Sequence, residues 1–468
     1  MKSIINRVGL LLSVLHLTGT LSTEALQAQT IIPTSHSPTI KTLAQDRVLQ
    51  SQTTVPPHLN ALDQQNVSEA VPLIEQFWEQ EYGDYFKTNF SFESMQAKNI
   101  AETLAKIATQ TEKKSAVIYL IPRSQRLELV LITAQGQPVY KRVLEAKREV
   151  LLKQVQELNN FVVNPVYRNN NRYLSSAQQL YRWMISPIEA DLQAQGIDTL
   201  LFCVGEGLRT LPFAALHDGQ QFLVEKYGFS RIPAFKLTDT VYADLRNSQV
   251  LAMGASEFKD QNSLPAVPLE LAAIRKNQWQ GKSFLNQDFT LTNLQSQRTS
   301  QPFRIIHLAT HAEFQPGVSS NSYIQFWDTK LTLDRMKHLG WNDPIVELLV
   351  LSACRTALGD KDAELGFAGL ALQARVKSVV ASLWNVSDQG TLALMAEFYR
   401  DLKTAPIKAE ALRQAQISML KGQARLQDGH LQSARGNITL PSLLAQLENE
   451  DLSHPYYWAA FTVVGNPW

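Results

Sequence analysis

Short apolar runs alternate with amphipathic stretches in the second half of the chain. The runs "VLAMGAS", "RIIHLATH", "ELLVLSAC" and "SVVASLWNV" end at polar residues or glycine, and helical patterns such as "LELAAIRKNQW" and "GTLALMAEFYRDL" follow them. A parallel strand that is buried on both faces reads as an almost continuous apolar run. The order therefore predicts an α/β domain with a mostly parallel sheet between helices. The final "HPYYWAAFTVVGNPW" predicts one added strand.

The first half has a different pattern. Residues 115–133 contain two β-rich runs around a polar turn and predict a hairpin, and the run at 199–205 predicts a buried strand. The stretch between them predicts two helices that break at Pro187. Residues 66–113 carry apolar positions at helical spacing without an internal repeat, and residues 29–65, rich in Ser, Thr, Gln and Pro, predict a flexible linker.

Residues 1–28 have the layout of a secretory signal. Lys2 and Arg7 precede a short apolar run, and the small residues Ala25 and Ala28 follow it. The run is shorter than the roughly 20 apolar residues that a membrane span needs. We expect this segment to be cleaved and the mature protein to be exported, to the periplasm or outside the cell, with no stable membrane span. The alternative is that the segment is retained as an anchor.

The net charge and the cysteine count argue against several classes of partner and site. The chain has 468 residues and a formal net charge of +1, without a long basic stripe, which argues against nucleic acid as a partner. It has two cysteines, Cys203 and Cys354. Two isolated cysteines cannot build a disulfide framework or a zinc site of paired cysteines. Cys203 lies within an apolar run, where a buried thiol is the default expectation.

The two candidate catalytic residues are the last residues of two of the apolar runs. His311 ends "RIIHLATH", and Cys354 ends "ELLVLSAC". If one crossover joins two neighbouring parallel strands, both side chains meet at one edge of the sheet, where α/β proteins place their sites. A nearby imidazole can activate a thiol and later protonate a leaving amine. Taken singly, a strand-end Cys or His more often serves packing. His307, four residues before His311, is expected on the same face as a buried structural residue.

Four sequence blocks decide between these interpretations. "HLATHAEF", "VLSACRTALGD", "GFAGLALQARVKSVVASLWNVSD" and "HPYYWAAFTVVGNP" occur in this order and together resemble the CHAT family of caspase-like cysteine peptidases, which is related to separase. The resemblance covers about residues 115–468. It implies a caspase-like α/β/α sandwich with a His311–Cys354 dyad in residues 248–468. It further implies a degenerate, noncatalytic caspase-like half at residues 114–247, preceded by the helical segment.

The resemblance also implies an activity and its requirements. It implies a cysteine endopeptidase that acts on a protein or peptide substrate and needs no metal or organic cofactor. Related peptidases often have glycine after the histidine, whereas this chain has Ala312. The backbone N–H groups of Ala312 and Cys354 are the expected oxyanion donors. CHAT chains frequently carry tetratricopeptide arrays, and since none is recognisable here, a regulatory module would come from a separate chain.

Asp388, in "LWNVSDQGT", is the candidate substrate-binding residue. Related separase-type enzymes place an acidic residue in this block to hold an arginine before the scissile bond, and a carboxylate can grip guanidinium with two hydrogen bonds. The competing interpretation is a helix N-cap, a role for which Ser387 competes. Asp362 and Glu364 are weaker candidates, expected in a solvated loop.

Two further functions stay open at this point. The nearest alternative is a noncatalytic caspase-like scaffold that binds protein partners. A redox sensor that uses Cys203 and Cys354 is the third, and it requires the two Cα atoms to lie within about 7 Å.

Overall fold

The computed structural model describes residues 55–90, 93–356, 358–433, 436–440 and 451–468. The predicted export signal at 1–28 and most of the predicted linker lie outside these residues. Residues Pro56–Trp468 form one compact unit. In the part of the chain that the structure describes, every helix is too short or too polar to cross a membrane.

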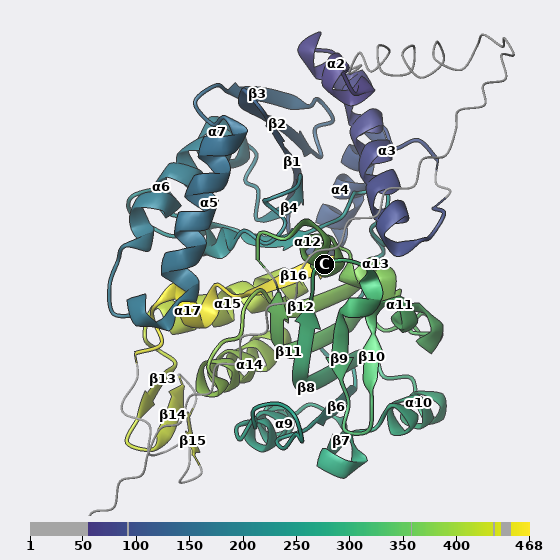
Figure 1. The fold of residues 1–468 in the computed structure, drawn as a ribbon, viewed down its shortest axis with the longest axis vertical. Helices are drawn as coiled ribbons and strands as arrows, with labels where there is room; N and C mark the ends of the chain where they lie inside the picture. Colours follow the sequence, from purple (N-terminus) through teal and green to yellow (C-terminus); the bar gives the residue numbers. More distant parts are fainter. Residues whose placement is uncertain (1–54, 91–92, 357, 434–435, 441–450) are drawn as a thin grey trace, which may run out of the picture. The chain divides into compact units, whose positions relative to one another are not determined.

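A mixed, mostly parallel sheet runs through this unit (Figure 1). Its main path has the order β10-β9-β8-β11-β12-β16-β5-β4-β1-β2-β3, and β6 pairs with both β7 and β8. The strands are β1 (Ser115–Arg123), β2 (Arg126–Thr133), β3 (Val139–Val143), β4 (Thr199–Val204), β5 (Gly228–Arg231), β6 (Val250–Gly254), β7 (Gly281–Leu285), β8 (Ile305–Phe314), β9 (Tyr323–Gln325), β10 (Lys330–Thr332), β11 (Leu348–Thr356), β12 (Ser378–Ser382) and β16 (Phe461–Gly465).

Helices cover both faces of this sheet. α9, α14, α15 and α5–α7 lie on one face, and α3, α4 and α11–α13 lie on the other (Figure 1). The helices are α2 (Pro57–Asp63), α3 (Val67–Phe86), α4 (Ala97–Thr111), α5 (Arg148–Val163), α6 (Tyr173–Met184), α7 (Ser186–Ala194), α8 (Leu223–Lys226), α9 (Val267–Lys276), α10 (Leu291–Ser300), α11 (Leu333–Met336), α12 (Lys361–Ala368), α13 (Leu370–Ala374), α14 (Asp388–Leu402), α15 (Lys408–Leu420) and α17 (Pro455–Trp458).

The apolar runs are the central strands, as predicted. β4, β6, β12 and β16 are buried along their whole length, which is possible only because helices cover both faces. The predicted hairpin is β1–β2, and the predicted helix pair is α6–α7, with Pro187 in the first turn of α7. The predicted α/β/α sandwich with its helical N-terminal region is confirmed.

The C-terminal strand holds the two predicted halves in one sheet. β16 pairs antiparallel with β12 and parallel with β5, so it lies between the strands of residues 114–247 and those of residues 248–468. The last side chain continues this link, because Trp468 is fully buried and its indole N–H donates to Ser115 Oγ at 2.8 Å. The two halves therefore share one hydrophobic core.

Two local features differ from the predictions. α2 lies within the range predicted as a flexible linker, and it is ordered because Ala61 and Leu62 are buried against the rest of the unit. A separate small sheet, β13 (Arg425–Gln427), β14 (His430–Ser433) and β15 (Gly436–Thr439), was not predicted. Its first turn is Asp428–Gly429 with positive φ at both residues, a turn that an Asp-Gly pair in the sequence favours.

Glu75 fixes the N-terminal helical segment to the sheet. This carboxylate on α3 is fully buried and accepts hydrogen bonds from Tyr119 Oη at 2.8 Å and from the backbone N–H groups of Phe235 (2.9 Å) and Lys236 (2.8 Å). Burial raises the pKa of Glu75, and the three donors oppose that shift. All three donors face a buried site, so each depends on this one carboxylate.

We expect Glu75→Leu to lower the free energy of unfolding by about 3 kcal/mol, because three buried donors lose their acceptor. Urea unfolding followed by circular dichroism measures this change. Glu102→Leu is the matched control, because Glu102 is exposed on α4 and the same substitution there is expected to change stability by less than about 0.5 kcal/mol. Equal unfolding midpoints for the two variants would contradict the anchoring role.

Candidate active site

Two neighbouring strands carry the predicted dyad. β8 and β11 pair in parallel, and the pairing sets Ala353 beside His311 and Cys354 beside Ala312. The backbones of His311 and Cys354 are therefore diagonal neighbours on adjacent strands. The side chain of Cys354 lies outside the described part of the structure. The fold therefore places the backbones of His311 and Cys354 next to each other on neighbouring strands.

Both strands are longer than the apolar runs predict. β8 continues to Phe314 and β11 to Thr356, so the dyad residues lie inside the strands rather than at their ends. The register also shifts, because β8 carries one extra residue between Leu308 and His311. A bulge of this kind places two residues opposite one and interrupts the alternation of faces. The rule that placed His307 and His311 on one face therefore does not extend across this segment.

A backbone carbonyl and an aromatic ring hold the imidazole of His311. Its Nε2 lies 2.8 Å from the carbonyl oxygen of Asn262, and the centroids of its ring and the Phe258 ring are 4.7 Å apart. A carbonyl oxygen can only accept a hydrogen bond, so Nε2 carries the hydrogen. In the neutral ring, the free lone pair is then on Nδ1. Nδ1 is therefore the atom of His311 that can take up a proton.

We call residues 256–266, between β6 and α9, the Asn262 loop. The loop is closed at its base, where Leu264 N–H donates to the Ser256 carbonyl at 2.9 Å. Neither Asn262 nor Phe258 was predicted as a site residue. Any residue type can offer a backbone carbonyl, so the contact of Asn262 leaves no signature in the sequence.

Asp388 begins α14 but does not cap it. The N-cap is Ser387, whose Oγ accepts from Gly390 N–H at 3.1 Å, so the cap interpretation of Asp388 is wrong. Asp388 Oδ2 instead accepts from the N–H of Ala266, the last residue of the Asn262 loop, at 2.6 Å. Burial raises the pKa of Asp388 to about 6, and the hydrogen bond from Ala266 opposes the shift. The Asn262 loop thus contacts both His311 and Asp388.

Ala312 lies in the interior of the sheet. It is buried, and its neighbours are Cys354 on β11 and Ile324 on β9. Its N–H therefore faces a neighbouring strand in this conformation. The oxyanion role of Ala312 stays a prediction from the sequence.

His307 is a buried structural residue. Its Nε2 lies 3.0 Å from Glu270 Oε1 on α9, and its ring packs edge-on against Tyr399 on α14, with 5.5 Å between the ring centroids. None of the three side chains is more than 3% exposed. They join β8 to the two helices whose first residues contact the Asn262 loop.

The acidic residues predicted in a solvated loop lie in α12 instead. Glu364 is 1% exposed, and it accepts hydrogen bonds from Gly207 N–H at 2.9 Å and Thr210 Oγ1 at 3.0 Å. Burial raises the pKa of Glu364. Glu364 therefore holds the loop that follows β4, while Asp362 is only half-buried in the first turn of the helix.

The redox interpretation is wrong, because the two cysteines lie on distant strands. Cys203 is on β4, and β5, β16 and β12 separate β4 from β11. Four strand spacings place the two Cα atoms about 19 Å apart, well beyond the disulfide limit of about 7 Å. The thiol of Cys203 is fully buried, lies 3.3 Å from the Pro233 carbonyl oxygen, and has its pKa raised well above the ordinary value by burial.

We expect iodoacetamide to alkylate Cys354 of the native protein and to leave Cys203 unmodified, because a buried thiol with a raised pKa offers neither access nor thiolate. Mass spectrometry of tryptic peptides measures the two sites separately. In Cys354→Ala, labelling is expected only after urea is added. Equal labelling of the two native thiols would remove the argument for an activated Cys354.

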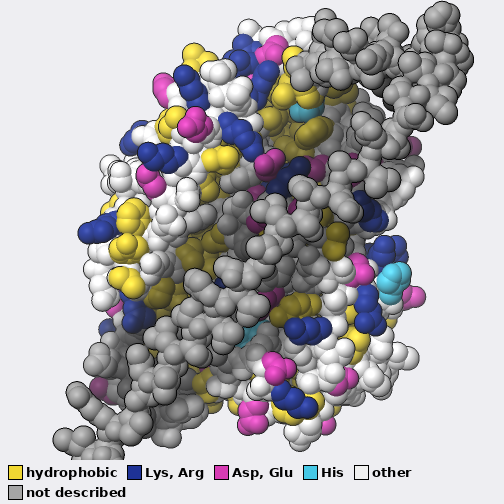
Figure 2. All heavy atoms as spheres, viewed as in Figure 1, with side chains coloured by type: hydrophobic (Ala, Val, Ile, Leu, Met, Phe, Trp, Pro, Cys, Tyr) yellow, Lys and Arg dark blue, Asp and Glu magenta, His cyan; other side chains and the backbone are white. Residues whose placement is uncertain are grey.

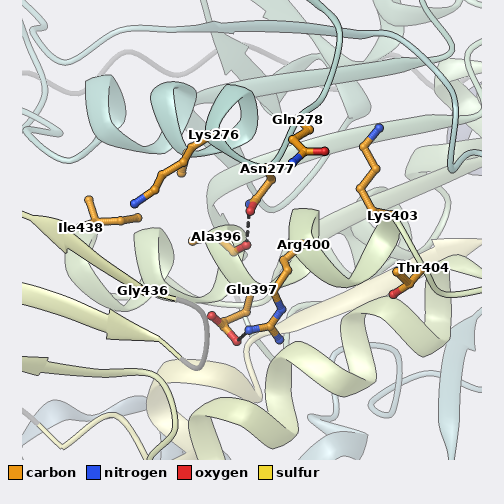
Figure 3. Close-up of a pocket in the computed structure, with 11 residues that line it drawn as sticks. Lys276, Asn277, Gln278, Ala396, Glu397, Arg400, Lys403, Thr404, Gly436 and Ile438 are labelled. Carbon is orange, nitrogen blue, oxygen red and sulfur yellow. Dashed lines mark hydrogen bonds and ion pairs between the residues drawn. The ribbon is translucent and has the colours of Figure 1, made fainter.

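A hollow of 370 Å³ lies away from the dyad, between α9, α14 and the small sheet (Figure 3). Glu397 and Arg400 face one another in it as an ion pair, and Asn277 donates to the carbonyl of Ala396 at 3.0 Å. Lys276 Nζ donates to a backbone carbonyl of the small sheet at 3.1 Å. These polar groups are engaged with one another or with backbone.

On the face drawn in Figure 2, Lys and Arg side chains lie among Asp and Glu side chains. Across the described residues, no three His, Cys, Asp or Glu side chains gather as a metal-binding group.

A mostly parallel sheet between two helical layers, with a histidine and a cysteine position side by side on β8 and β11, defines a caspase-like protein. The model of the CHAT domain family matches residues 174–466, more than half of the chain, and the chain belongs to this family. No curated protein sequence matches it significantly.

Solved structures give two comparisons. Separase in the Saccharomyces cerevisiae separase–securin complex is 10% identical, with a TM-score of 0.49, over 85% of this chain and 34% of separase. The complex of Porphyromonas gingivalis RgpB pro- and mature domains is 10% identical, with a TM-score of 0.36, over 68% of this chain and 76% of the other. This chain thus spans about a third of the separase chain.

Proposed function

We propose that this protein is a cysteine endopeptidase that uses His311 and Cys354 as its dyad. The observation that carries the proposal is the parallel pairing of β8 with β11, which sets Cys354 beside Ala312 and His311 beside Ala353. Membership of the CHAT family, whose fold is that of caspase-like cysteine peptidases, supports it. The orientation of His311 supports it further, because the contact with Asn262 leaves Nδ1 free to accept a proton.

The proposed chemistry has two steps. Nδ1 of His311 takes the proton of the Cys354 thiol, and the thiolate attacks the carbonyl carbon of the scissile peptide bond. The imidazolium then gives this proton to the leaving amine as the C–N bond breaks, which leaves a thioester on Cys354. In the second step, His311 removes a proton from water, and the hydroxide oxygen displaces the sulfur. The imidazolium returns that proton to the departing thiolate, so the thiol and the neutral imidazole are restored and the acid product leaves.

We also propose that Asp388 selects a basic residue, arginine above lysine, before the scissile bond. Asp388 and His311 contact the same loop, Asp388 through Ala266 and His311 through Asn262. One of its oxygens is already committed to Ala266, and the other is the atom available to a guanidinium N–H. A planar guanidinium fits a carboxylate better than an ammonium does.

A peptide-library cleavage screen on the purified protein, with Cys354→Ala as control, tests the proposed activity. Cleavage by the native protein alone supports the peptidase. Absence of cleavage by both, with tight binding of a protein partner, would favour the scaffold instead.

We further propose export, for which the signal pattern at residues 1–28 is the sole support, and N-terminal sequencing of the mature protein tests it.

A further inference from the structure

We propose that a cavity of 780 Å³ beside the loop that follows Cys354 binds the extended backbone of the polypeptide substrate, at a distance from the scissile bond. This inference rests on the proposed peptidase function. The cavity lies between the second half of α5, the loop after β4 and the start of α12. Its volume falls within the range of about 300–1,000 Å³ that is typical of ligand sites.

The cavity is lined in part by residues that follow Cys354 closely in the chain. Leu358 and Gly359 line it, and they follow Cys354 by 358 − 354 = 4 and 359 − 354 = 5 residues. The opposite wall is α5, which belongs to the half of the chain that carries neither dyad residue. A peptide held here is therefore near the end of β11. The noncatalytic half would supply the wall that holds it.

Amide side chains dominate the polar part of the wall. Gln156, Asn159 and Asn160 line the cavity from α5, and Asn164 lines it just beyond the helix. The Oδ1 atom of Asn159 is buried and has no hydrogen-bond partner among the described residues. This atom is shielded from solvent, so it meets a peptide N–H only after rotation about χ2 of Asn159 turns it into the cavity, and the peptide then supplies the missing donor. Amides that can both donate and accept suit a peptide backbone, which offers both groups.

The cavity presents no free charge among its described lining residues. Glu364 is the charged residue that lines it, and both of its oxygens already accept hydrogen bonds, from Gly207 and Thr210. The rest of the wall is apolar and includes Leu152 and Val155. A neutral, partly apolar wall favours backbone contacts over the recognition of a charged side chain. The substrate segment bound here is therefore expected to be tolerant of sequence.

Gly207, in the loop after β4, packs closely against α5 at the wall of the cavity. Gly207 has a φ of +86°, and a Cβ on it would lie 2.4 Å from Leu152 Cδ2 on α5. Its positive φ favours glycine, because residues with a Cβ rarely adopt this backbone conformation. Because Glu364 fixes the same loop from the other side, the cavity exists before any peptide enters.

The test compares a long with a short substrate on the full-length protein. Reduced, carboxymethylated casein is the long probe, and a library of tetrapeptides with a fluorogenic leaving group is the short one. In Asn159→Leu, the ratio of kcat/KM for casein to that for the tetrapeptides is expected to fall about fivefold, the value of one hydrogen bond. Gln156→Trp, which fills the cavity from an exposed position, is expected to lower the ratio further. Gln193→Trp, at an exposed position on α7, is the matched control and is expected to keep the ratio.

An unchanged ratio in both cavity variants would overturn the inference. If the native protein cleaves neither probe, the proposed peptidase fails, and the cavity is judged by binding alone. Fluorescein-labelled casein is then titrated against Cys354→Ala, with and without Asn159→Leu or Gln156→Trp, by fluorescence polarisation. Weaker binding in the two cavity variants supports the site, and equal or absent binding overturns it.

Discussion

Cys354→Ala is expected to abolish peptide cleavage, and His311→Ala is expected to lower kcat/KM by about 10⁴- to 10⁶-fold, the range for loss of one member of a catalytic group. In the proposed mechanism the thiol supplies the electron pair that attacks the carbonyl, and alanine carries no such pair. The imidazole supplies the base and the acid. Hydrolysis of the peptide library by the purified variants, measured at equal concentrations of folded protein, checks both values.

Two further variants make this test specific. Cys203→Ala is the matched control, because Cys203 is buried on β4, four strand spacings from β11, and its loss is expected to leave cleavage intact. The double variant of His311 and Cys354 is expected to be no less active than Cys354→Ala, because residues that act as a unit are not additive. Full cleavage by Cys354→Ala would rule out the dyad.

The positions of β8 and β11 could be predicted because their sequences leave few choices. Each is an apolar run with one crossover of helical and polar sequence between them, and such runs form neighbouring parallel strands between helical layers. Apolar runs also predicted β4, β6 and β12, and two β-rich runs around a polar turn predicted the hairpin β1–β2. The prediction that His311 and Cys354 lie on neighbouring strands followed from this topology and from the sequence blocks that resemble the CHAT family.

The finer geometry of the site was not predictable. The extra residue in β8 has no signature in "RIIHLATHAEF", because the pairing of the strand with β11 decides where a bulge falls. Asn262 acts through its backbone carbonyl, so its side chain says nothing of the contact. Glu364 was expected in a solvated loop because a charged residue usually faces water. The donors that make its burial tolerable come from Gly207 and Thr210, more than 150 residues away in sequence.

The place of β16 also needed the structure. The sequence predicted a final strand, but periodicity does not say which strand it pairs with. Its insertion between β5 and β12 is what gives the two halves one sheet. This insertion brings the loop after β4 and helix α5 close to the end of β11, where they line a cavity together with Leu358 and Gly359.

Asp388→Asn is expected to lower kcat/KM for arginine substrates by about 10²- to 10³-fold, because a desolvated guanidinium would lose its countercharge. Asparagine retains an oxygen that can accept from Ala266 N–H, so the Asn262 loop is expected to keep its place. Alkylation of Cys354 is therefore expected to be nearly unaltered. Cleavage of a fluorogenic arginine peptide and its lysine counterpart measures the change.

Asp388→Ala separates recognition from loop anchoring, because it removes both the charge and the acceptor for Ala266. If Asp388 only anchors the loop, Asp388→Ala is expected to lower cleavage of all substrates equally, and Asp388→Asn is expected to change little. If Asp388 binds arginine, both variants are expected to lose the preference for arginine over uncharged residues. A preference that survives in Asp388→Asn would eliminate the recognition role.

The pH dependence gives an independent check on the same residue. Only the ionised carboxylate attracts guanidinium, and burial sets the pKa of Asp388 to about 6 in the free protein. The carboxylate is protonated below that pH and ionised above it, so kcat/KM for arginine peptides is expected to rise with pH through about 6. Asparagine does not titrate, and the rise that belongs to Asp388 is therefore expected to vanish in Asp388→Asn.

Peptides without a basic residue serve as the control, because their cleavage does not need the charge of Asp388. Their profile is expected to be the same in the native protein and in the variant, and a difference there would assign the titration to the Asn262 loop instead.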